Sequence, residues 1–224
     1  MTVPHDASAL WKFLYLLLTL FRGLFCRLRI EGAELVPTHG GCIIACNHTR
    51  GPDFVMLAYA SPRQIYYMAK TEIFAWHPLL TKLLKSVGTF PVERGKADAT
   101  AIQTAFDITR GGHVLGMFPE GTRSKTGQLS RGKSGVARIA MMAEVPVVPA
   151  VVINAPAILP GLFKFRRRPL VIVRFGQPIT MRGNAEEPAD IRANTDQLMH
   201  AMATLLPPEL QGFYREKVTA AVPK

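Results

Sequence analysis

Hydrophobic and polar positions along the chain change period several times, and each change marks a new predicted element. Short apolar runs rich in β-branched residues predict strands at residues 41–46, 64–69, 88–94, 113–118, 145–153 and 170–175, and residues 29–34 predict a strand and turn. Amphipathic stretches predict helices at residues 53–60, 74–87, 97–109, 134–142 and 190–206. The pair His77-Pro78 is expected to disturb the start of the helix over residues 74–87. This alternation predicts an α/β fold, a single domain with a mixed, largely parallel central sheet flanked by helices. Two prolines within residues 145–153 predict an edge position or an irregular start for that strand.

The first predicted helix covers residues 10–29 and is apolar over most of its surface. Its polar positions recur three and four residues apart and form one narrow stripe, namely Lys12, Tyr15, Thr19, Arg22, Cys26 and Arg29. We expect an amphipathic membrane-associating helix, with the basic stripe toward lipid headgroups and the apolar face in the acyl region. The alternatives are packing on the domain's own core and a short segment that spans or dips into the membrane. The expected organisation is this helix over 8–29, the α/β domain over 30–206 and a loosely held tail over 207–224.

The charge balance narrows the class of partner. The 224 residues carry a formal net charge of +11, and the isoelectric point is about 10.0. Such a charge favours nucleic acid, a phospholipid surface or a phosphorylated substrate. No recognised nucleic-acid-binding motif is present, so we expect no nucleic acid. Two of the three cysteines lie in a buried-strand pattern, which indicates reduced thiols and a cytosolic face, and no Cys/His grouping has the spacing of a structural zinc site.

A histidine and an aspartate flank the Gly-Pro break that follows the strand over residues 41–46. His48 lies in the turn and Asp53 lies in the first turn of the next helix, so the chain can fold the carboxylate back toward the imidazole ring. A carboxylate on one ring nitrogen selects the tautomer whose other nitrogen can accept a proton, as a general base must. By itself the pair is also consistent with a surface histidine and an aspartate that suits the helix dipole.

Two cations follow other predicted strands. Lys70 ends the strand over residues 64–69, which we expect beside the His48 strand, where the lysine or neighbouring N–H groups would lie near a developing oxyanion. Arg94 ends the strand over residues 88–94, and the planar fork of an arginine suits a phosphate. Each of these residues alone is equally typical of a solvated strand end.

The loop after the strand over residues 113–118 contains a glycine and several side chains able to contact an anion. A glycine lets backbone N–H groups approach a ligand closely, and the hydroxyl and guanidinium groups donate hydrogen bonds. Glu120 is a carboxylate in a basic loop, where it would orient Arg123 or hold a substrate hydroxyl. The candidate members of this site are Glu120, Gly121, Thr122 and Arg123.

Taken together and in order, four segments resemble the motifs of the glycerolipid acyltransferase family, typified by bacterial 1-acylglycerol-3-phosphate acyltransferase. They are Asn-His-Thr-Arg-Gly-Pro-Asp at 47–53, Gly-Thr-Phe-Pro-Val-Glu-Arg at 88–94, Phe-Pro-Glu-Gly-Thr-Arg-Ser at 118–124 and Val-Pro-Val-Val-Pro at 145–149. Four motifs with ordinary spacing are much more specific than any one of them. The resemblance covers about residues 41–153, half of the chain, and Thr-Arg-Gly-Pro replaces the common wording of the first motif.

The resemblance implies an acyltransferase domain over 30–206 that needs no metal and no cofactor. In this interpretation His48, oriented by Asp53, deprotonates the hydroxyl of a lysophospholipid acceptor, foremost 1-acylglycerol-3-phosphate. The oxygen then attacks the thioester of acyl-CoA or acyl carrier protein directly, without an acyl-enzyme, and Lys70 stabilises the oxyanion. The residues that would hold the acceptor phosphate are Arg94, Glu120, Gly121, Thr122 and Arg123.

The expected location is the membrane surface, on the cytoplasmic face of the inner membrane. An aromatic and basic cluster over residues 162–168 would contact anionic headgroups or the phosphates of coenzyme A, or would form a solvated hairpin tip. Other acceptors stay open, namely a lyso-aminolipid, another lysolipid or glycerol phosphate. A thioesterase and a non-catalytic membrane-surface protein are the alternatives from other classes.

Overall fold

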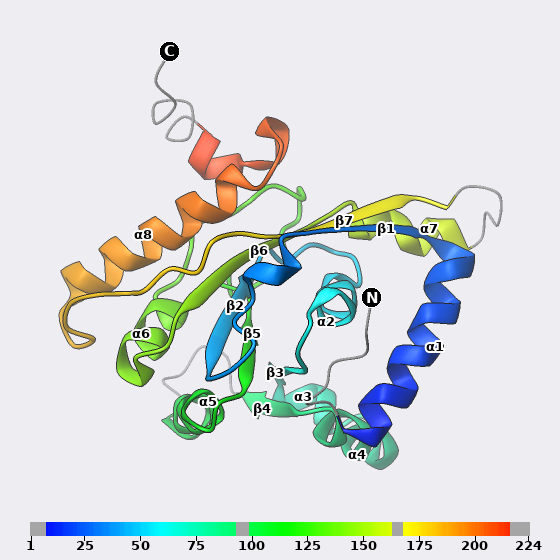
Figure 1. Ribbon diagram of the computed structural model, residues 1–224, viewed down its shortest axis with the longest axis horizontal. Coiled ribbons are helices and arrows are strands. Elements are labelled where there is room, and N and C mark those ends of the chain that lie inside the picture. The colour runs from blue at the N-terminus through cyan, green and yellow to red at the C-terminus, as the bar shows by residue number, and fades with distance from the viewer. Residues whose placement is uncertain (1–7, 93–98, 163–167, 216–224) are drawn as a thin grey trace.

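The computed structural model describes residues 8–92, 99–162 and 168–215. Within these ranges seven strands form one sheet in the order β1-β7-β6-β2-β5-β3-β4 (Figure 1). The strands are β1 Arg27–Glu31, β2 Cys42–Cys46, β3 Ile65–Lys70, β4 Thr89–Val92, β5 Val114–Met117, β6 Val147–Ile153 and β7 Leu170–Phe175. Every neighbouring pair is parallel except β6 and β7, which are antiparallel. The predicted α/β fold with a mixed, largely parallel sheet is confirmed.

Helices cover both faces of this sheet (Figure 1). On one face α2 packs against the strands and α1 packs on the outer side of α2. On the other face lie α5, α6 and α8. The helices of the described residues are α1 Ala9–Phe25, α2 Asp53–Ala60, α3 Thr71–Phe74, α4 Pro78–Ser86, α5 Ala99–Arg110, α6 Gly135–Ala143, α7 Ile158–Leu162 and α8 Pro188–Thr204.

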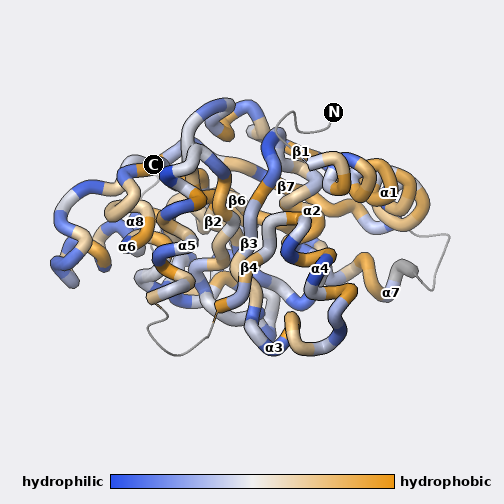
Figure 2. Tube along the Cα trace, turned by 90° about the horizontal axis from the view of Figure 1, so that it is seen from below, coloured by the Kyte–Doolittle hydropathy of each residue, from blue (hydrophilic) through white to orange (hydrophobic). Residues whose placement is uncertain are grey.

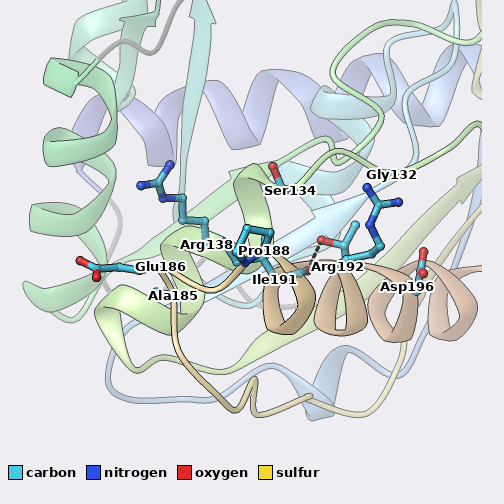
Figure 3. A pocket seen from close by; sticks show the side chains of 10 residues that line it. Gly132, Ser134, Arg138, Ala185, Glu186, Pro188, Ile191, Arg192 and Asp196 are labelled. Carbon is cyan, nitrogen blue, oxygen red and sulfur yellow. Dashed lines mark hydrogen bonds between the residues drawn. The ribbon is translucent and has the colours of Figure 1, made fainter.

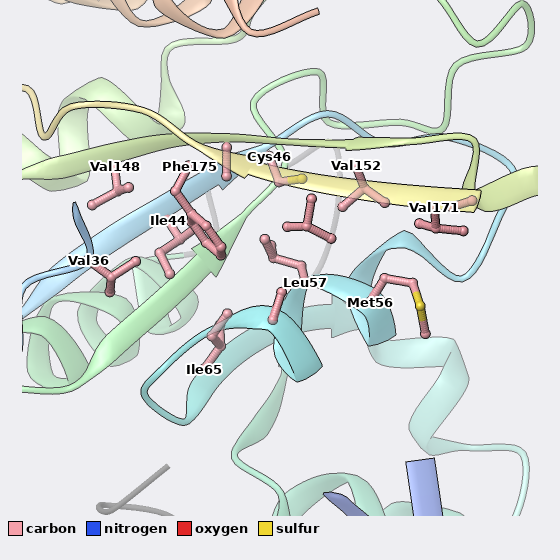
Figure 4. Packing of buried hydrophobic residues seen from close by; sticks show 14 of the residues in the cluster. Val36, Ile44, Cys46, Met56, Leu57, Ile65, Val148, Val152, Val171 and Phe175 are labelled. Carbon is pink, nitrogen blue, oxygen red and sulfur yellow. The ribbon is translucent and has the colours of Figure 1, made fainter. Parts of the chain in front are cut away.

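The strand before His48 is buried on both of its faces, which explains its unbroken apolar sequence. Ile44 belongs to the core between the sheet and α2, where it lies close to Leu57 (Figure 4). Ile43, its neighbour in sequence, belongs to the core between the sheet and helices α6 and α8. Successive side chains of a strand point to opposite faces, so a central strand with helices on both sides must be apolar throughout.

The helix predicted over residues 74–87 is interrupted near its start, at the His77-Pro78 pair where the sequence predicted a disturbance. The chain forms the short helix α3 and then begins α4 at Pro78. The ring of His77 caps α4 by accepting the N–H of Leu79 at 3.1 Å. Proline suits the first helical position because its missing N–H would have no partner there.

Of the two prolines, only Pro149 lies in β6, and this strand is not at an edge, which was one of the two positions predicted from the sequence. β6 lies between β2 and β7, in the interior of the sheet. The carbonyl of Pro149 accepts the N–H of Gly176, which comes just after the last residue of β7. The missing N–H of Pro149 is on the same side, where the β7 ladder has already ended, so the sheet loses no hydrogen bond.

The amino-terminal helix is shorter than predicted. It ends at Phe25, and the backbone is extended at Cys26. The chain then enters the sheet as β1, which pairs with β7 from Arg27 onward. Hydrogen bonding to β7 therefore takes residues 27–29 out of the helix.

The middle of the polar stripe, Tyr15, Thr19 and Arg22, faces inward, which contradicts the expected orientation toward headgroups, whereas Lys12 is exposed. The ring of Tyr15 is buried and stacks on Tyr59 of α2, with 4.5 Å between the ring centroids. The hydroxyl of Thr19 lies 3.1 Å from that of Tyr59, and the guanidinium of Arg22 lies over the same ring. The stripe is therefore the surface by which α1 packs on the domain, because its polar and aromatic groups match those of Tyr59.

The wide apolar face of α1 consequently points away from the domain. Its side chains are 37–61% exposed, namely Leu10, Phe13, Leu16, Leu17, Leu20 and Leu24. Figure 2 shows α1 as a largely hydrophobic segment at the edge of the molecule. Among the described residues, no helix combines the length and the hydropathy that crossing a membrane requires.

The residues after α8 are held more firmly than the expected loose tail, at least as far as residue 215. Two 3₁₀ turns, Pro208–Leu210 and Gly212–Tyr214, pack against the chain around Leu129. The ring of Tyr214 is buried, and its hydroxyl accepts the N–H of Gly132 at 3.1 Å. These residues thus belong to the domain and support the loop that leads into α6.

Candidate active site

The carboxyl ends of the parallel strands bring several predicted site residues to one edge of the sheet. β2, β5, β3 and β4 are mutually parallel neighbours, so the residues that follow them lie along the same edge. His48 follows β2, Glu120 follows β5 and Lys70 ends β3. This edge is where sheets of this class place ligands.

His48 and Asp53 form a buried hydrogen-bonded pair. The Nδ1 atom of His48 lies 2.7 Å from Oδ2 of Asp53, which also accepts the N–H of Thr49 at 2.9 Å. Asp53 is fully buried and His48 is 7% exposed. With the proton on Nδ1, the Nε2 atom carries the free lone pair, and within the described residues it makes no hydrogen bond. The structure thus confirms the prediction that the chain folds the carboxylate of Asp53 back toward the imidazole of His48.

Two features hold the turn that carries His48. The side chain of Asn47 bonds both backbone groups of Val152 in β6, accepting its N–H at 2.7 Å and donating to its carbonyl at 3.2 Å. Gly51 lies so close to the chain after β6 that a Cβ atom would come within 2.4 Å of the carbonyl carbon of Ala155. The turn is therefore fixed against β6 by a side chain on one side and by backbone contact on the other.

The loop after β5 fastens to the backbone of His48 at two points. One carboxylate oxygen of Glu120 accepts the N–H of His48 at 2.8 Å, and the other accepts the N–H of Ser130 at 2.9 Å. The carbonyl of His48 in turn accepts the N–H of Ser124 at 2.7 Å. Burial raises the pKa of the Glu120 carboxyl, and the hydrogen bonds from His48 and Ser130 offset part of that rise.

This geometry assigns Glu120 a different task from the one expected. The side chain is 3% exposed, and both of its oxygens are occupied by backbone donors, so it does not reach out of the loop to orient Arg123. It positions the residue that carries the imidazole. The signal available in the sequence was the carboxylate itself, out of place in a basic loop, but its partners are 72 and 10 residues away.

The other predicted phosphate-binding residues lie at the exposed tip of the same loop. Thr122 and Arg123 are exposed to solvent, two residues and one residue before Ser124, which is bonded to His48. The N–H of Gly121 closes a turn onto the carbonyl of Phe118 at 2.9 Å, so it is not the free donor that we expected. A Cβ atom at Gly121 would lie 2.9 Å from the ammonium nitrogen of Lys133, a cation that had no predicted role.

Lys70 and Arg94 complete the predicted set. Lys70 is exposed at the end of β3, but β5 lies between β3 and β2, so the two strands are not adjacent as we had expected. Arg94 lies outside the described residues, as do residues 163–167 of the predicted basic cluster. Arg168 is described, and its guanidinium donates to the carbonyl of Gly23 in α1 at 2.7 Å.

Comparison with known proteins agrees with this geometry. A family model described as acyltransferase matches residues 27–153. The 1-acyl-sn-glycerol-3-phosphate acyltransferase of Bacillus subtilis (strain 168) is 33% identical over 165 residues, which are 73% of this chain and 79% of that protein. This chain belongs to the acyltransferase family.

Two further relatives extend the comparison. The 1-acyl-sn-glycerol-3-phosphate acyltransferase of Cocos nucifera is 35% identical over 126 residues, 54% of this acyltransferase and 40% of the plant protein. The crystal structure of the 1-acyl-sn-glycerophosphate (LPA) acyltransferase PlsC from Thermotoga maritima superposes with a TM-score of 0.63 at 20% identity. It covers 91% of this chain and 77% of that one, and so shares the fold.

An aromatic residue that the sequence did not single out packs against the His48–Asp53 pair of the acyltransferase. The ring of Phe118 stacks on the imidazole of His48, with 4.1 Å between centroids and 23° between planes. Tyr67 of β3 lies beyond it, 6.3 Å from Phe118, and donates its hydroxyl to the carbonyl of Phe54. Phe118 directly precedes the Pro-Glu-Gly turn, at the end of the strand predicted over residues 113–118. A large apolar residue at that position was the signal in the sequence that could have identified it.

Cys46 lies two residues before His48, but its environment does not suit a nucleophile. The side chain is fully buried, and its thiol donates to Oδ1 of Asn47 at 3.5 Å. Burial raises the pKa of the Cys46 thiol well above its usual range, and the negative charges of Asp53 and Glu120 raise it further. A neutral, enclosed thiol does not attack a thioester, so Cys46 does not suit the role of a nucleophile.

A separate hollow lies between α6 and α8, on the face of the sheet opposite α2 (Figure 3). It has a volume of about 410 Å³ and is lined by Arg138 and Arg192 together with Glu186 and Asp196. Charges of both signs are present, and none of the predicted site residues takes part. We therefore assign this hollow no role in the reaction of the acyltransferase.

Proposed function

We propose that this acyltransferase transfers an acyl chain from acyl-CoA or acyl carrier protein to the free hydroxyl of 1-acylglycerol-3-phosphate and so forms phosphatidate. Its relatives from Bacillus subtilis and Cocos nucifera bear the name of that reaction. The observation that carries the proposal is the buried 2.7 Å contact between His48 and Asp53 at the carboxyl edge of the sheet.

The chemistry needs one proton to move twice. Nε2 of His48 takes the proton from the acceptor hydroxyl as its oxygen attacks the thioester carbonyl carbon, and the carboxylate of Asp53 stabilises the imidazolium that forms. The tetrahedral intermediate then collapses, the carbon–sulfur bond breaks, and the imidazolium returns the proton to the thiolate. General-base assistance of this kind contributes about 10²–10⁴-fold to the rate.

The acceptor phosphate requires cations beside this pair. Arg123 and Thr122 are exposed within two residues of Ser124, whose N–H is bonded to the carbonyl of His48, which supports their role as phosphate ligands. Arg94 is proposed for the same task from its place in the second motif, and Lys70 for the oxyanion. Arg123→Ala is expected to raise the KM for lysophosphatidate more than it lowers kcat, because a phosphate contact acts in ground and transition states alike.

A variant of the base tests the reaction itself. In an assay with labelled acyl-CoA and lysophosphatidate, His48→Ala is expected to lower kcat by about 10²–10⁴-fold. His39→Ala removes an exposed histidine and is the matched control. Undiminished transfer by a folded His48→Ala protein, with its circular dichroism unchanged, would refute the assignment. A panel of lysolipids, glycerol phosphate and water as acceptors, each with both donors, then identifies the substrates and separates transferase from thioesterase activity.

The proposed acceptor is a membrane lipid, and α1 offers a surface for it. The outward apolar face of α1 extends along the helix from Leu10 to Leu24, which is typical of a helix that lies in the interface of a bilayer. The inward polar stripe fastens this helix to α2, the helix that begins with Asp53. Docking through α1 on the cytoplasmic membrane surface would therefore hold the catalytic edge close to the lipid.

A further inference from the structure

The segment between β3 and β4 is unusually exposed for its composition. Helices α3 and α4 contain no buried residue, although α4 is rich in leucine. Trp76, in the link between the helices, is 75% exposed, and Leu79 and Leu83 are 71% and 40% exposed. Leu80 and Leu84 lie on the more covered side of the same helix, so α4 has apolar side chains both toward the domain and away from it.

This exposed ridge, defined as Trp76, Leu79 and Leu83, belongs to a segment whose end lies next to the start of α1. Val87, at the end of α4, packs on the aromatic cluster by which α1 contacts α2. The backbone N–H of Ser8, the cap of α1, donates to Oε1 of Gln64 at 3.0 Å, and the amide of Gln64 donates to the carbonyl of Val87 at 3.4 Å. The start of α1 and the end of α4 are therefore joined, and Figures 1 and 2 place both helices at the same end of the molecule.

The charges of α4 favour an anionic surface. Lys82 and Lys85 are exposed on the helix, and α4 contains no acidic residue. Tryptophan beside lysine is typical of the depth at which acyl chains meet headgroups, since the indole and the ammonium both have one apolar and one polar end. A protein partner would not require the surplus of positive charge that the whole chain carries, which is +11.

We propose that α4 is a second membrane-contacting element, whose ridge enters the same anionic bilayer surface as the apolar face of α1. This inference rests on the membrane docking of α1 proposed above. α3 begins at the residue after Lys70, so the ridge extends from the carboxyl edge of the sheet that also carries His48. Contact at α1 alone leaves the domain free to tilt about one helix. Contact at α1 and α4 together defines a plane and orients the catalytic edge toward the lipid.

The two tryptophans of the chain make the contact directly observable. Trp11→Phe leaves Trp76 as the single tryptophan. On addition of vesicles of phosphatidylglycerol and phosphatidylcholine, its emission is expected to shift to shorter wavelength, and brominated acyl chains are expected to quench it. Trp76→Phe is the matched control, because the remaining Trp11 is already buried against Tyr15 and its emission wavelength is expected to stay constant.

A second pair of variants measures the strength of the contact. The double variant Trp76→Ser/Leu79→Ser is expected to lower partition into these vesicles by about tenfold or more, since two large apolar side chains stay in water. Met142→Ser replaces an exposed apolar residue of α6, on the other face, and is expected to leave the partition unchanged. With a short-chain lysophosphatidate dissolved in buffer, both variants are expected to keep the wild-type rate.

The outcomes separate this inference from the proposals on which it rests. Vesicle-bound protein whose Trp76 emission neither shifts nor is quenched would refute the contact by α4 and leave docking by α1 intact. Wild-type protein that does not bind vesicles would refute both. Short-wavelength emission of Trp76 before vesicles are added, in a protein that sediments as a dimer, would assign the ridge to an interface between copies. If the wild-type protein does not acylate the dissolved acceptor, the proposed chemistry fails, and this outcome is measured separately from vesicle binding.

Discussion

Replacing Asp53 by asparagine separates the two tasks that the carboxylate performs for His48. The same oxygen, Oδ2, accepts both the Nδ1–H of His48 and the backbone N–H of Thr49, whereas Oδ1 is buried without a hydrogen bond in the described structure. An asparagine must therefore place its carbonyl oxygen at the Oδ2 position, because its NH₂ group would face the N–H of Thr49. The tautomer of His48 is kept, and only the negative charge is lost.

The size of the effect follows from that charge. A carboxylate about 4 Å from the imidazolium centre, at an effective dielectric constant of about 20, is worth about 4 kcal/mol, and an amide dipole retains part of it. We expect Asp53→Asn to lower kcat by about 10²–10³-fold, with little change in the KM for either substrate. Asp53→Ala removes the orienting acceptor as well and is expected to cost about tenfold more, the value of one further hydrogen bond of about 1.4 kcal/mol.

Steady-state kinetics with labelled acyl-CoA measures both variants, and Asp107→Asn, at an exposed aspartate of α5, is the control for the chemical change. Equal losses in Asp53→Asn and Asp53→Ala would show that the amide does not keep the tautomer, so the contact with Thr49 would not decide its orientation. Activity of Asp53→Asn within a few-fold of wild type would refute the charge argument altogether.

Three further predictions concern the surroundings of the pair. Glu120→Gln puts an NH₂ group against a backbone donor, and His48 is expected to shift as a result. We expect kcat to fall by up to about 10²-fold, with the KM for lysophosphatidate unchanged. A raised KM with unchanged kcat would make Glu120 a phosphate-site residue. Gly51→Ala brings a methyl group against the backbone of Ala155 and is expected to lower both kcat and the melting temperature, whereas Gly23→Ala, which has open space around it, should leave kcat unchanged. Burial raises the pKa of the Cys42 thiol to about 11. The thiol therefore contributes stability that is fully present below the usual thiol pKa and is lost as the pH rises through about 11. Urea unfolding between pH 8 and 11 should show that the free energy of unfolding falls more steeply with pH in wild type than in Cys42→Ala.

The sequence was sufficient wherever one local pattern carries the information. The apolar run of β2 follows from composition, and the start of α2 at Asp53, directly after Pro52, follows from the tolerance of helix starts for proline. Their separation by one short turn also brings His48 and Asp53 within reach of each other. The alternation of strands and helices then requires a parallel arrangement, which places the strand ends and their polar residues at one edge.

Periodicity was insufficient where a choice between two faces was needed. The pattern of α1 shows that Tyr15, Thr19 and Arg22 share a face, but it does not show what that face contacts. Tyr59, which lies 40 residues from Thr19, decided that the polar stripe turns inward and the apolar face outward. The position of β6 was decided in the same way, since only the pairing of β7 reveals that Pro149 loses no ladder bond.

Local sequence thus determined the elements of this acyltransferase and the pairing of His48 with Asp53, because turns and hydrophobic periods act over a few residues. The tertiary structure alone decided what holds that pair in place. Asn47 bonds a strand 105 residues away, and Glu120 reaches back 72 residues to the backbone of His48. Hydrogen bonds between such distant groups leave no periodic trace in a sequence, since each partner is satisfied only when the chain has brought the other beside it.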